Sequence, residues 1–184
     1  VEPDSTFVNL LADELLGGGL VFEGQLQRGA HGTAGEMDYL RNVRGVEHVG
    51  GIGSVWGYYR DELRRQGETI QQGVTALDIL LAAQRGDQRA AAAVRQTAER
   101  LARAIATISN IIDPGVVVLA GQLAKFAGPV VEEINWRLPE IAYSPPAVVA
   151  STLGDDVVLR GALEMAIDDV RTNIVFLPNG AGSD

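Results

Sequence analysis

Apolar runs and glycine turns divide the first part of the chain into strands. The run Phe7–Leu11 is short and mostly apolar, which predicts a strand. Gly19–Glu23 and Gln25–Arg28 lie on either side of Gly24, and this arrangement predicts a hairpin that turns at the glycine. Three successive antiparallel strands are therefore expected at the start of the chain.

Helical periodicity dominates the middle of the chain. The longest pattern begins at Asp87, a good capping residue, and ends at Ile112, with apolar residues recurring every three or four positions. Asp113-Pro114-Gly115 then stops the helix. Shorter helices are expected at Val55–Gln66, at Thr75–Gln84, from about Pro129 to near Pro139, and at Asp155–Val170, with Leu159, Leu163, Ala166, Ile167 and Val170 facing inward.

Two further strands are expected after the longest helix. Val116–Ala120 is an apolar, β-branched run typical of a buried parallel strand, and Ala147–Ser151 is a final short strand. The order is three antiparallel strands, a helical segment, then strand, helix, strand and helix, which is the order of one ribonuclease H-like lobe. We therefore expect an α/β fold with a mixed five-stranded sheet, in one domain over residues 1–184.

Composition and charge exclude several classes of function. The chain has no cysteine, so disulfides, thiolate metal sites and a cysteine nucleophile are excluded. Its formal net charge of -9 opposes direct binding to nucleic acid, because phosphates are held mainly by Lys and Arg. No apolar segment approaches the roughly 20 residues needed to span a bilayer, and no signal-like segment opens the chain. A cytoplasmic location without membrane contact is expected.

The segment Gly29–Glu36 concentrates three glycines, a histidine and a carboxylate. The glycines allow close approach of the main chain to a ligand, and Glu36 offers two acceptor oxygens of the kind that bind a pair of sugar hydroxyls. A tight turn with a solvated Glu36 and a surface His31 is the alternative interpretation.

The run Gly17–Glu36 resembles the signature of the ROK family, which comprises sugar kinases and sugar-responsive repressors built on an actin-like ATPase fold. Ile112–Gly121 resembles the later strand and adenosine-side glycine turn of the same family. The resemblance implies that the chain is a C-terminal ROK lobe, with an upstream lobe and any DNA-binding winged helix outside it. A full-length protein with a winged helix would bind DNA even though this lobe would not. A sugar ligand and homo-oligomers are also implied.

The expected phosphate-binding turn departs from the family pattern. ROK kinases carry a turn of the form Gly-Thr-Gly-Ile-Gly between the first two strands, and here the residues are Asp13-Glu14-Leu15-Leu16-Gly17. At about 5 Å and an effective dielectric of about 20, each carboxylate and phosphate pair costs on the order of 3 kcal/mol, or about two decades of affinity. We therefore expect no ATP here, with Gly17 and Gly121 as vestiges of a nucleotide site. The plainer interpretation of Asp13 and Glu14 is a solvated turn between strands.

The family's zinc site is also altered. It is usually built by a His three residues after the motif Glu and by a Cys-x-Cys-Gly-x-x-Gly-Cys run. The His position holds Tyr39, the Cys positions hold Glu47, Val49 and Ser54, and Gly50 and Gly53 stay in register. Tetrahedral zinc needs about four N, S or carboxylate ligands, so we expect no zinc and no other metal. Glu47 and His48 are adjacent, and the side chains of adjacent residues seldom converge on one metal ion.

The resemblance assigns the sugar side to a few residues. Glu36 matches the motif Glu, while Tyr39 replaces the family's sugar-contacting His and Trp56 replaces a second Glu. An aromatic ring can stack on a sugar face, so Trp56 is a candidate sugar contact, or else it fills the space left by the missing zinc module. Gly32 lies in the same loop, and His31 either faces the ligand or is bonded within the turn.

The leading hypothesis is an effector-binding lobe of a ROK-type transcriptional regulator, a pseudo-kinase that takes a sugar or a related metabolite. It depends on an intact Gly29–Glu36 segment beside an altered phosphate turn and zinc site. The first alternative is a lobe of a divergent ATP-dependent ROK sugar kinase that holds its nucleotide differently. The second is a purely structural or assembly lobe. The resemblance places the general base of the kinases upstream, so this segment alone is expected to be inert.

Overall fold

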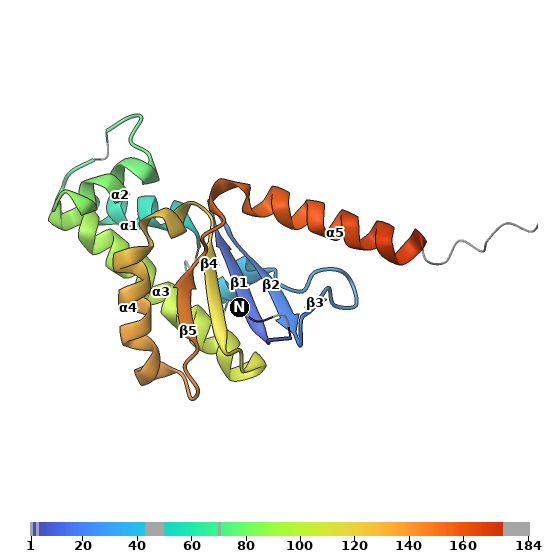
Figure 1. Ribbon diagram of the computed structural model, residues 1–184. Coiled ribbons are helices and arrows are strands. Elements are labelled where there is room, and N and C mark those ends of the chain that lie inside the picture. The colour runs from blue at the N-terminus through green and yellow to red at the C-terminus, as the bar shows by residue number, and fades with distance from the viewer. Residues whose placement is uncertain (1, 3, 43–49, 70, 175–184) are drawn as a thin grey trace, which may run out of the picture. The chain divides into compact units, whose positions relative to one another are not determined.

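A computed structural model describes residues 2, 4–42, 50–69 and 71–174 of the chain (Figure 1). The chain divides into two units, Val1–Thr152 and Leu153–Asp184, which are described separately. The first unit holds the sheet and most of the helices, and the second holds a 3-10 turn and one long helix.

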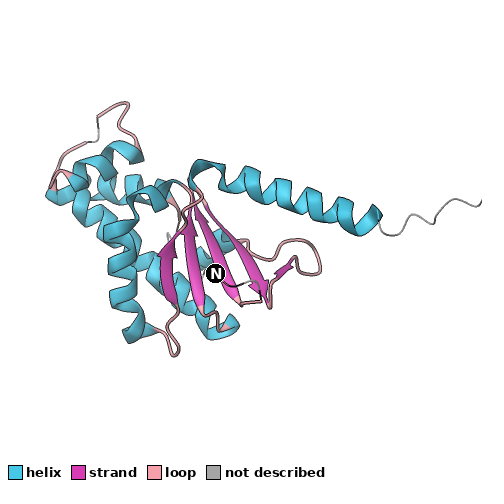
Figure 2. Ribbon diagram, viewed as in Figure 1, coloured by secondary structure: helices cyan, strands magenta, loops and turns pink. Residues whose placement is uncertain are grey.

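A mixed five-stranded sheet forms the centre of the first unit (Figure 2). Its spatial order is β3-β2-β1-β4-β5. The first three strands pair antiparallel, whereas β4 lies parallel to β1 and β5 parallel to β4. The bounds are β1 Phe7–Ala12, β2 Leu16–Phe22, β3 Gln25–Gln27, β4 Val116–Ala120 and β5 Ala147–Ala150. The predicted fold class is confirmed.

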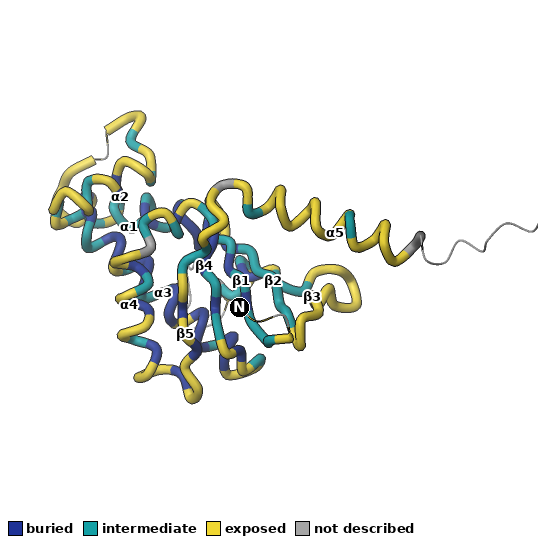
Figure 3. Tube along the Cα trace, in the orientation of Figure 1, coloured by how far each residue is buried: buried dark blue, intermediate teal, exposed yellow. Residues whose placement is uncertain are grey.

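Helices pack against one face of this sheet and form the core. The alternating residues Val8 and Leu10 of β1 are fully buried, and they share one apolar cluster with Leu101 and Ile105 of α3. Figure 3 shows buried stretches along the sheet and along α3. The helix α3 also packs extensively on α1, α2 and α4. The bounds are α1 Ile52–Arg65, α2 Ala76–Gln84, α3 Gln88–Ile112 and α4 Ala127–Ile141, with 3-10 helices η1 Met37–Asn42 and η2 Gln122–Phe126.

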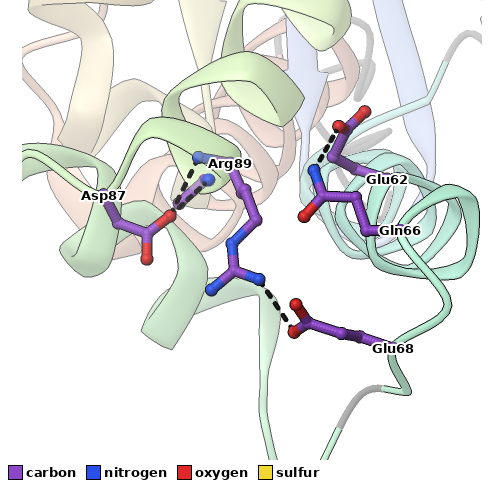
Figure 4. A network of polar contacts seen from close by, with 6 residues as sticks. Glu62, Gln66, Glu68, Asp87 and Arg89 are labelled. Carbon is purple, nitrogen blue, oxygen red and sulfur yellow. Dashed lines mark hydrogen bonds and ion pairs between the residues drawn. The ribbon is translucent and has the colours of Figure 1, made fainter.

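Local capping fixes where α2 and α3 begin. Thr75 and Asp78 form a capping box at α2, and the hydrogen bond from the Thr75 hydroxyl holds the pKa of the Asp78 carboxyl below its usual range. The Asp87 carboxylate accepts from the first amides of α3. Arg89 donates to Glu68 at 2.8 Å and so joins the start of α3 to the segment after α1 (Figure 4).

Several boundaries differ from the sequence expectation, among them those of α1, β2 and α4. The helix α1 begins at Ile52, three residues earlier than Val55, because the Ile52 amide donates to the Asp13 carbonyl oxygen across the structure. The strand β2 begins at Leu16, directly after a short turn. The helix α4 continues past Pro139 to Ile141, so the proline does not end it.

The second unit consists of η3 Gly154–Asp156 and α5 Val157–Ile174. The expectation of an inward stripe on this helix is wrong for Leu159, Leu163 and Val170, which are 53% to 69% exposed. An apolar stripe needs a second layer to bury it, and this unit supplies none among its described residues. No helix of the described residues is both long and apolar enough to cross a membrane.

The two isoleucines Ile105 and Ile111 on α3 test the core directly, because Ile105 is 0% exposed and Ile111 is 79% exposed. Ile105→Ala should lower the free energy of unfolding by about 2–5 kcal/mol, since it leaves a cavity. Ile111→Ala should change it by less than about 0.5 kcal/mol. Urea unfolding measures both, and equal losses would contradict the assignment of the buried face.

Candidate functional site at the carboxyl ends of β1 and β4

The carboxyl ends of the parallel strands β1 and β4 lie side by side. Leu11 pairs with Ala120, so the turn that follows β1 meets the turn that follows β4 at one edge of the sheet. In open α/β sheets, ligands bind outside these carboxyl ends of the strands. The first turn holds Asp13 and Glu14, and the second holds Gly121 and Gln122.

Asp13 joins three elements at this edge. Its carbonyl oxygen accepts from the Ile52 amide at 2.5 Å, at the start of α1. Its carboxylate Oδ1 accepts from the Gln122 amide at 2.7 Å, at the start of η2. The expectation of a merely solvated turn is therefore wrong for Asp13, whose partner is 109 residues away in the sequence.

Glycines make the close approach of these turns feasible. Gly121 has φ +85°, and a Cβ there would lie 2.8 Å from Asp13 Oδ1 and 3.0 Å from the Ala12 carbonyl carbon. A Cβ at Gly51 would overlap the Asp13 carbonyl oxygen. A Cβ at Gly53 would lie 2.9 Å from the Glu14 carbonyl oxygen. Side chains at these positions would separate the turn from α1 and from η2.

The segment Gly29–Glu36 is a series of turns between β3 and η1. Gly29, Gly32 and Gly35 all have positive φ, between 71° and 96°, so all three use the left-handed region that favours glycine. The Ala34 amide donates to the Arg28 carbonyl oxygen at 3.2 Å, and the Glu36 amide donates to that of Thr33 at 3.3 Å. The glycines therefore shape the loop itself.

Two contacts hold Glu36 beside β2. A Cβ on Gly35 would overlap the Gly18 carbonyl oxygen, which shows how closely the loop crosses the strand. Met37, which follows Glu36 in the sequence, is buried, and its side chain packs against Gly18. The Glu36 side chain is exposed and makes no hydrogen bond or ion pair to the described residues. As far as the described residues go, both carboxylate oxygens are therefore available to a ligand.

The other residues proposed for the sugar side take different positions. His31 and Gly32 are exposed at the turn of the same loop, and Tyr39 is exposed on η1. Gly17 lies within β2 and pairs with Leu11, near the turn that holds Asp13. The structure therefore places His31, Gly32 and Tyr39 in or beside the Glu36 loop.

Trp56 is bound into the helical layer. Its indole Nε1 donates to the Val74 carbonyl oxygen at 3.1 Å, just before α2. The Arg60 guanidinium lies 5.1 Å from the centre of its ring, within cation–π range. The ring packs against the core cluster and is half-buried. These contacts favour a packing role for Trp56 over sugar stacking.

The altered zinc positions are only partly described. Glu47, His48 and Val49 lie outside the described residues. Tyr39 is exposed, and the Ser54 hydroxyl donates to the Gly51 carbonyl oxygen at 2.7 Å. The described ranges contain no cluster of three or more His, Cys, Asp or Glu side chains able to hold a metal. The expected absence of zinc stays a prediction.

A cavity of about 440 Å³ lies between α2, α3 and α4 and reaches the end of η2. Its walls are mainly apolar, with few polar groups, a composition typical of small-molecule sites. The lining includes Leu80, Val94, Phe126, Trp136, Arg95 and Glu132. None of the residues proposed from the sequence lines it, because its walls come from three helices whose packing no local motif reveals.

Sequence comparisons identify relatives of two kinds. The model of the ROK family matches residues 6–169. N-acetyl-D-glucosamine kinase of Vibrio cholerae is 30% identical over 176 residues, which cover 86% of this chain and 58% of that protein. Xylose repressor of Caldicellulosiruptor bescii is 27% identical over 178 residues, covering 84% of this chain and 44% of the repressor. The chain spans little more than half the length of its kinase relatives.

Structural comparison confirms the fold. A ROK family glucokinase from Streptomyces griseus, solved in complex with glucose and AMPPNP, superposes with a TM-score of 0.79. Its sequence is 21% identical, and the match covers 91% of this chain and 62% of that protein. At this identity the likeness establishes the actin-like fold of this chain and nothing about its ligands.

The prediction of a kinase-inactive regulator lobe is wrong. Several relatives named N-acetyl-D-glucosamine kinase match at 25% to 32% identity, and together they outweigh the xylose repressor, which matches at 27%. The prediction was based on an altered phosphate turn and an altered zinc site beside an intact Gly29–Glu36 segment. Altered residues at these two sites do not outweigh similarity over most of the chain.

Gly35 and Gly32 provide a matched test of how the loop is held. Both have positive φ, but only at Gly35 would a Cβ overlap another part of the chain. Gly32→Ala should lower the free energy of unfolding by about 1 kcal/mol, the cost of the left-handed conformation. Gly35→Ala should cost at least about 2 kcal/mol more, because the loop must leave Gly18. Equal losses in urea unfolding would show that the loop does not pack on β2 as described.

Proposed function

The chain belongs to the ROK family, and on that premise we propose that it is one lobe of an ATP-dependent sugar kinase that phosphorylates an N-acetylated hexosamine. The observation that carries the proposal is its similarity to N-acetyl-D-glucosamine kinase over 86% of the chain. The geometry at the carboxyl ends of β1 and β4 supports it, because the turn that holds Asp13 and the turn that holds Gly121 meet at that end of the sheet.

Glu36 is the residue that we propose binds the sugar. Its neighbours Gly35 and Met37 pack on Gly18, so the main chain at Glu36 is held in place while its carboxylate oxygens stay free of the described residues. A carboxylate accepts hydrogen bonds from two adjacent hydroxyls of one sugar ring. His31, Gly32 and Tyr39 lie close enough in the sequence to complete the same loop surface. Trp56 is left out, because its indole is already bonded to Val74.

The turn after β4 is the part that we propose faces the nucleotide. Gly121 brings the main chain close to β1, while the Gln122 amide at the start of η2 donates to Asp13 Oδ1. The stretch Ile112–Gly121 resembles the family's later strand and adenosine-side glycine turn. The turn between β1 and β2 cannot act as a glycine cradle, because Asp13, Glu14 and Leu15 occupy it. The nucleotide must therefore be held mainly from the β4 side.

In the proposed reaction, the role of this chain is to position the sugar and the nucleotide. A sugar hydroxyl oxygen forms a bond to the γ-phosphorus of ATP, the bond between that phosphorus and the β,γ-bridging oxygen breaks, and ADP leaves. The hydroxyl proton passes to a general base that we do not assign among the described residues. Zinc has no part in the proposal, because Tyr39 and Ser54 are poor zinc ligands.

Transfer of phosphate to N-acetyl-D-glucosamine by the full-length protein tests the proposal. We expect ATP-dependent formation of the sugar phosphate and ADP, followed by a coupled ADP assay and by mass spectrometry of the product. Glucose and N-acetyl-D-mannosamine serve as competing substrates to define the sugar class. Absence of transfer to all three sugars over a wide range of ATP concentration would contradict the proposal.

Glu36→Gln should lower kcat/KM for the sugar about 10-fold to 100-fold, because hydrogen bonds to a charged acceptor contribute about 1.5–3 kcal/mol. The KM for ATP should change little. Glu23→Gln is the matched control, since Glu23 is an exposed acid at the β2–β3 turn. Similar losses in both variants, or a loss confined to the KM for ATP, would remove Glu36 from the sugar site.

A further inference from the structure

One face of the sheet is apolar but lies outside the core. Side chains alternate between the two faces of each strand, and one set of them packs into the core cluster with the helices. The pairing registers place the other set side by side across β1, β2, β4 and β5. We call this second face the outer face, and its large apolar members are Phe7, Leu11, Val21, Val116, Val118 and Val149.

The described residues of the first unit leave the outer face without a covering layer. None of its six large apolar side chains belongs to the core cluster or packs against it. Five of them are half-buried, and Val149 is 42% exposed. Parallel strands are usually covered on both faces, and their sequences are then almost continuously apolar, as in β4 and β5. A further layer is therefore expected on the outer face.

The shape of the outer face fits a helix. Gly17 and Gly19 on β2 belong to it, and a Cβ at Gly17 would meet nothing within 4 Å, while one at Gly19 would meet only the Leu26 side chain, at 3.8 Å. The face is therefore low along β2, where another backbone can approach closely. Four strands about 4.8 Å apart give a surface wide enough for one helix, which is about 10–12 Å across with its side chains.

Asn9 is a polar residue in the middle of the outer face. It pairs with Gly19 on one side and with Val118 on the other. Its side chain is half-buried and makes no hydrogen bond to the described residues. A covering layer would bury this amide further, so it must bring a polar group that bonds to Asn9.

We propose that the outer face is the docking surface for an amphipathic helix from the part of the full-length protein that lies outside these 184 residues. Relatives of both kinds have such additional chain, because the match covers 58% of the Vibrio cholerae kinase and 44% of the xylose repressor. The apolar side of this helix packs on the valines of β4 and β5, and one of its polar groups bonds to Asn9. The proposal goes beyond the proposed function and does not depend on catalysis.

A helix of the same polypeptide fits this face better than a second copy of the chain. A tethered helix is present at a high effective concentration, whereas two free copies lose translational and rotational freedom when they associate. Each copy also carries a formal net charge of -9, so two copies repel one another. Both effects favour the tethered helix.

Thiol labelling of the full-length protein tests whether the outer face is covered. The 184 residues contain no cysteine, so Val118→Cys on the outer face and Ile111→Cys on α3 each introduce one thiol that peptide mass spectrometry can follow. Ile111 is 79% exposed and serves as the matched control. We expect maleimide to label Val118→Cys at least about 100-fold more slowly than Ile111→Cys, because a covered thiol reacts only after local opening. Similar labelling rates would show an open face and overturn the proposal.

Photochemical cross-linking identifies what covers the face. Replacement of Phe7 by p-benzoylphenylalanine keeps a phenyl ring on the outer face, and the same replacement of Tyr143, which is 99% exposed, is the control. We expect the probe at Phe7 to cross-link within one molecule to a peptide outside residues 1–184, and the probe at Tyr143 to give no such product. A cross-link between two copies, or to residues 153–174, overturns the proposal. A protein that protects Val118→Cys and gives the expected cross-link but phosphorylates no sugar keeps the docking surface and loses the proposed function.

Discussion

The hydrogen bond between the Asp13 carboxylate and the Gln122 amide fixes the turns at the carboxyl ends of β1 and β4 relative to each other. It joins the turn after β1 to the turn after β4, while the Asp13 carbonyl oxygen receives the first amide of α1. Glycines at positions 51 and 121 permit these approaches, since side chains there would collide with Asp13. A single residue thus sets the spacing of three elements at the edge where open α/β sheets bind ligands.

Local signals in the sequence predicted most of the elements. The apolar period of α3 and its ends at Asp87 and Asp113 depend on residues close to one another in the chain, and the structure confirms them within a residue. The start of α1 could not be predicted in the same way, because it is set by a bond between Ile52 and Asp13. The same reason explains the error at Asp13, whose partner lies 109 residues away. For α5, periodicity correctly predicted a helix. It could not show whether another element covers the apolar stripe, and Leu159, Leu163 and Val170 are exposed.

The candidate site shows a similar division. A glycine-rich loop with an available Glu36 could be predicted from the sequence, since positive φ at Gly29, Gly32 and Gly35 is a local property. Its attachment to β2 at Gly18 could not, because that contact depends on how the loop folds back. The error on function has a related cause. The altered phosphate turn and zinc site suggested lost kinase chemistry, whereas several of the relatives are named as kinases.

A crystal structure of the full-length protein with a non-hydrolysable ATP analogue and N-acetyl-D-glucosamine tests the central claim most directly. We predict sugar hydroxyls within about 3 Å of the Glu36 carboxylate oxygens and the nucleotide at the turn after β4. A complex in which the sugar lies away from Glu36 would contradict the account.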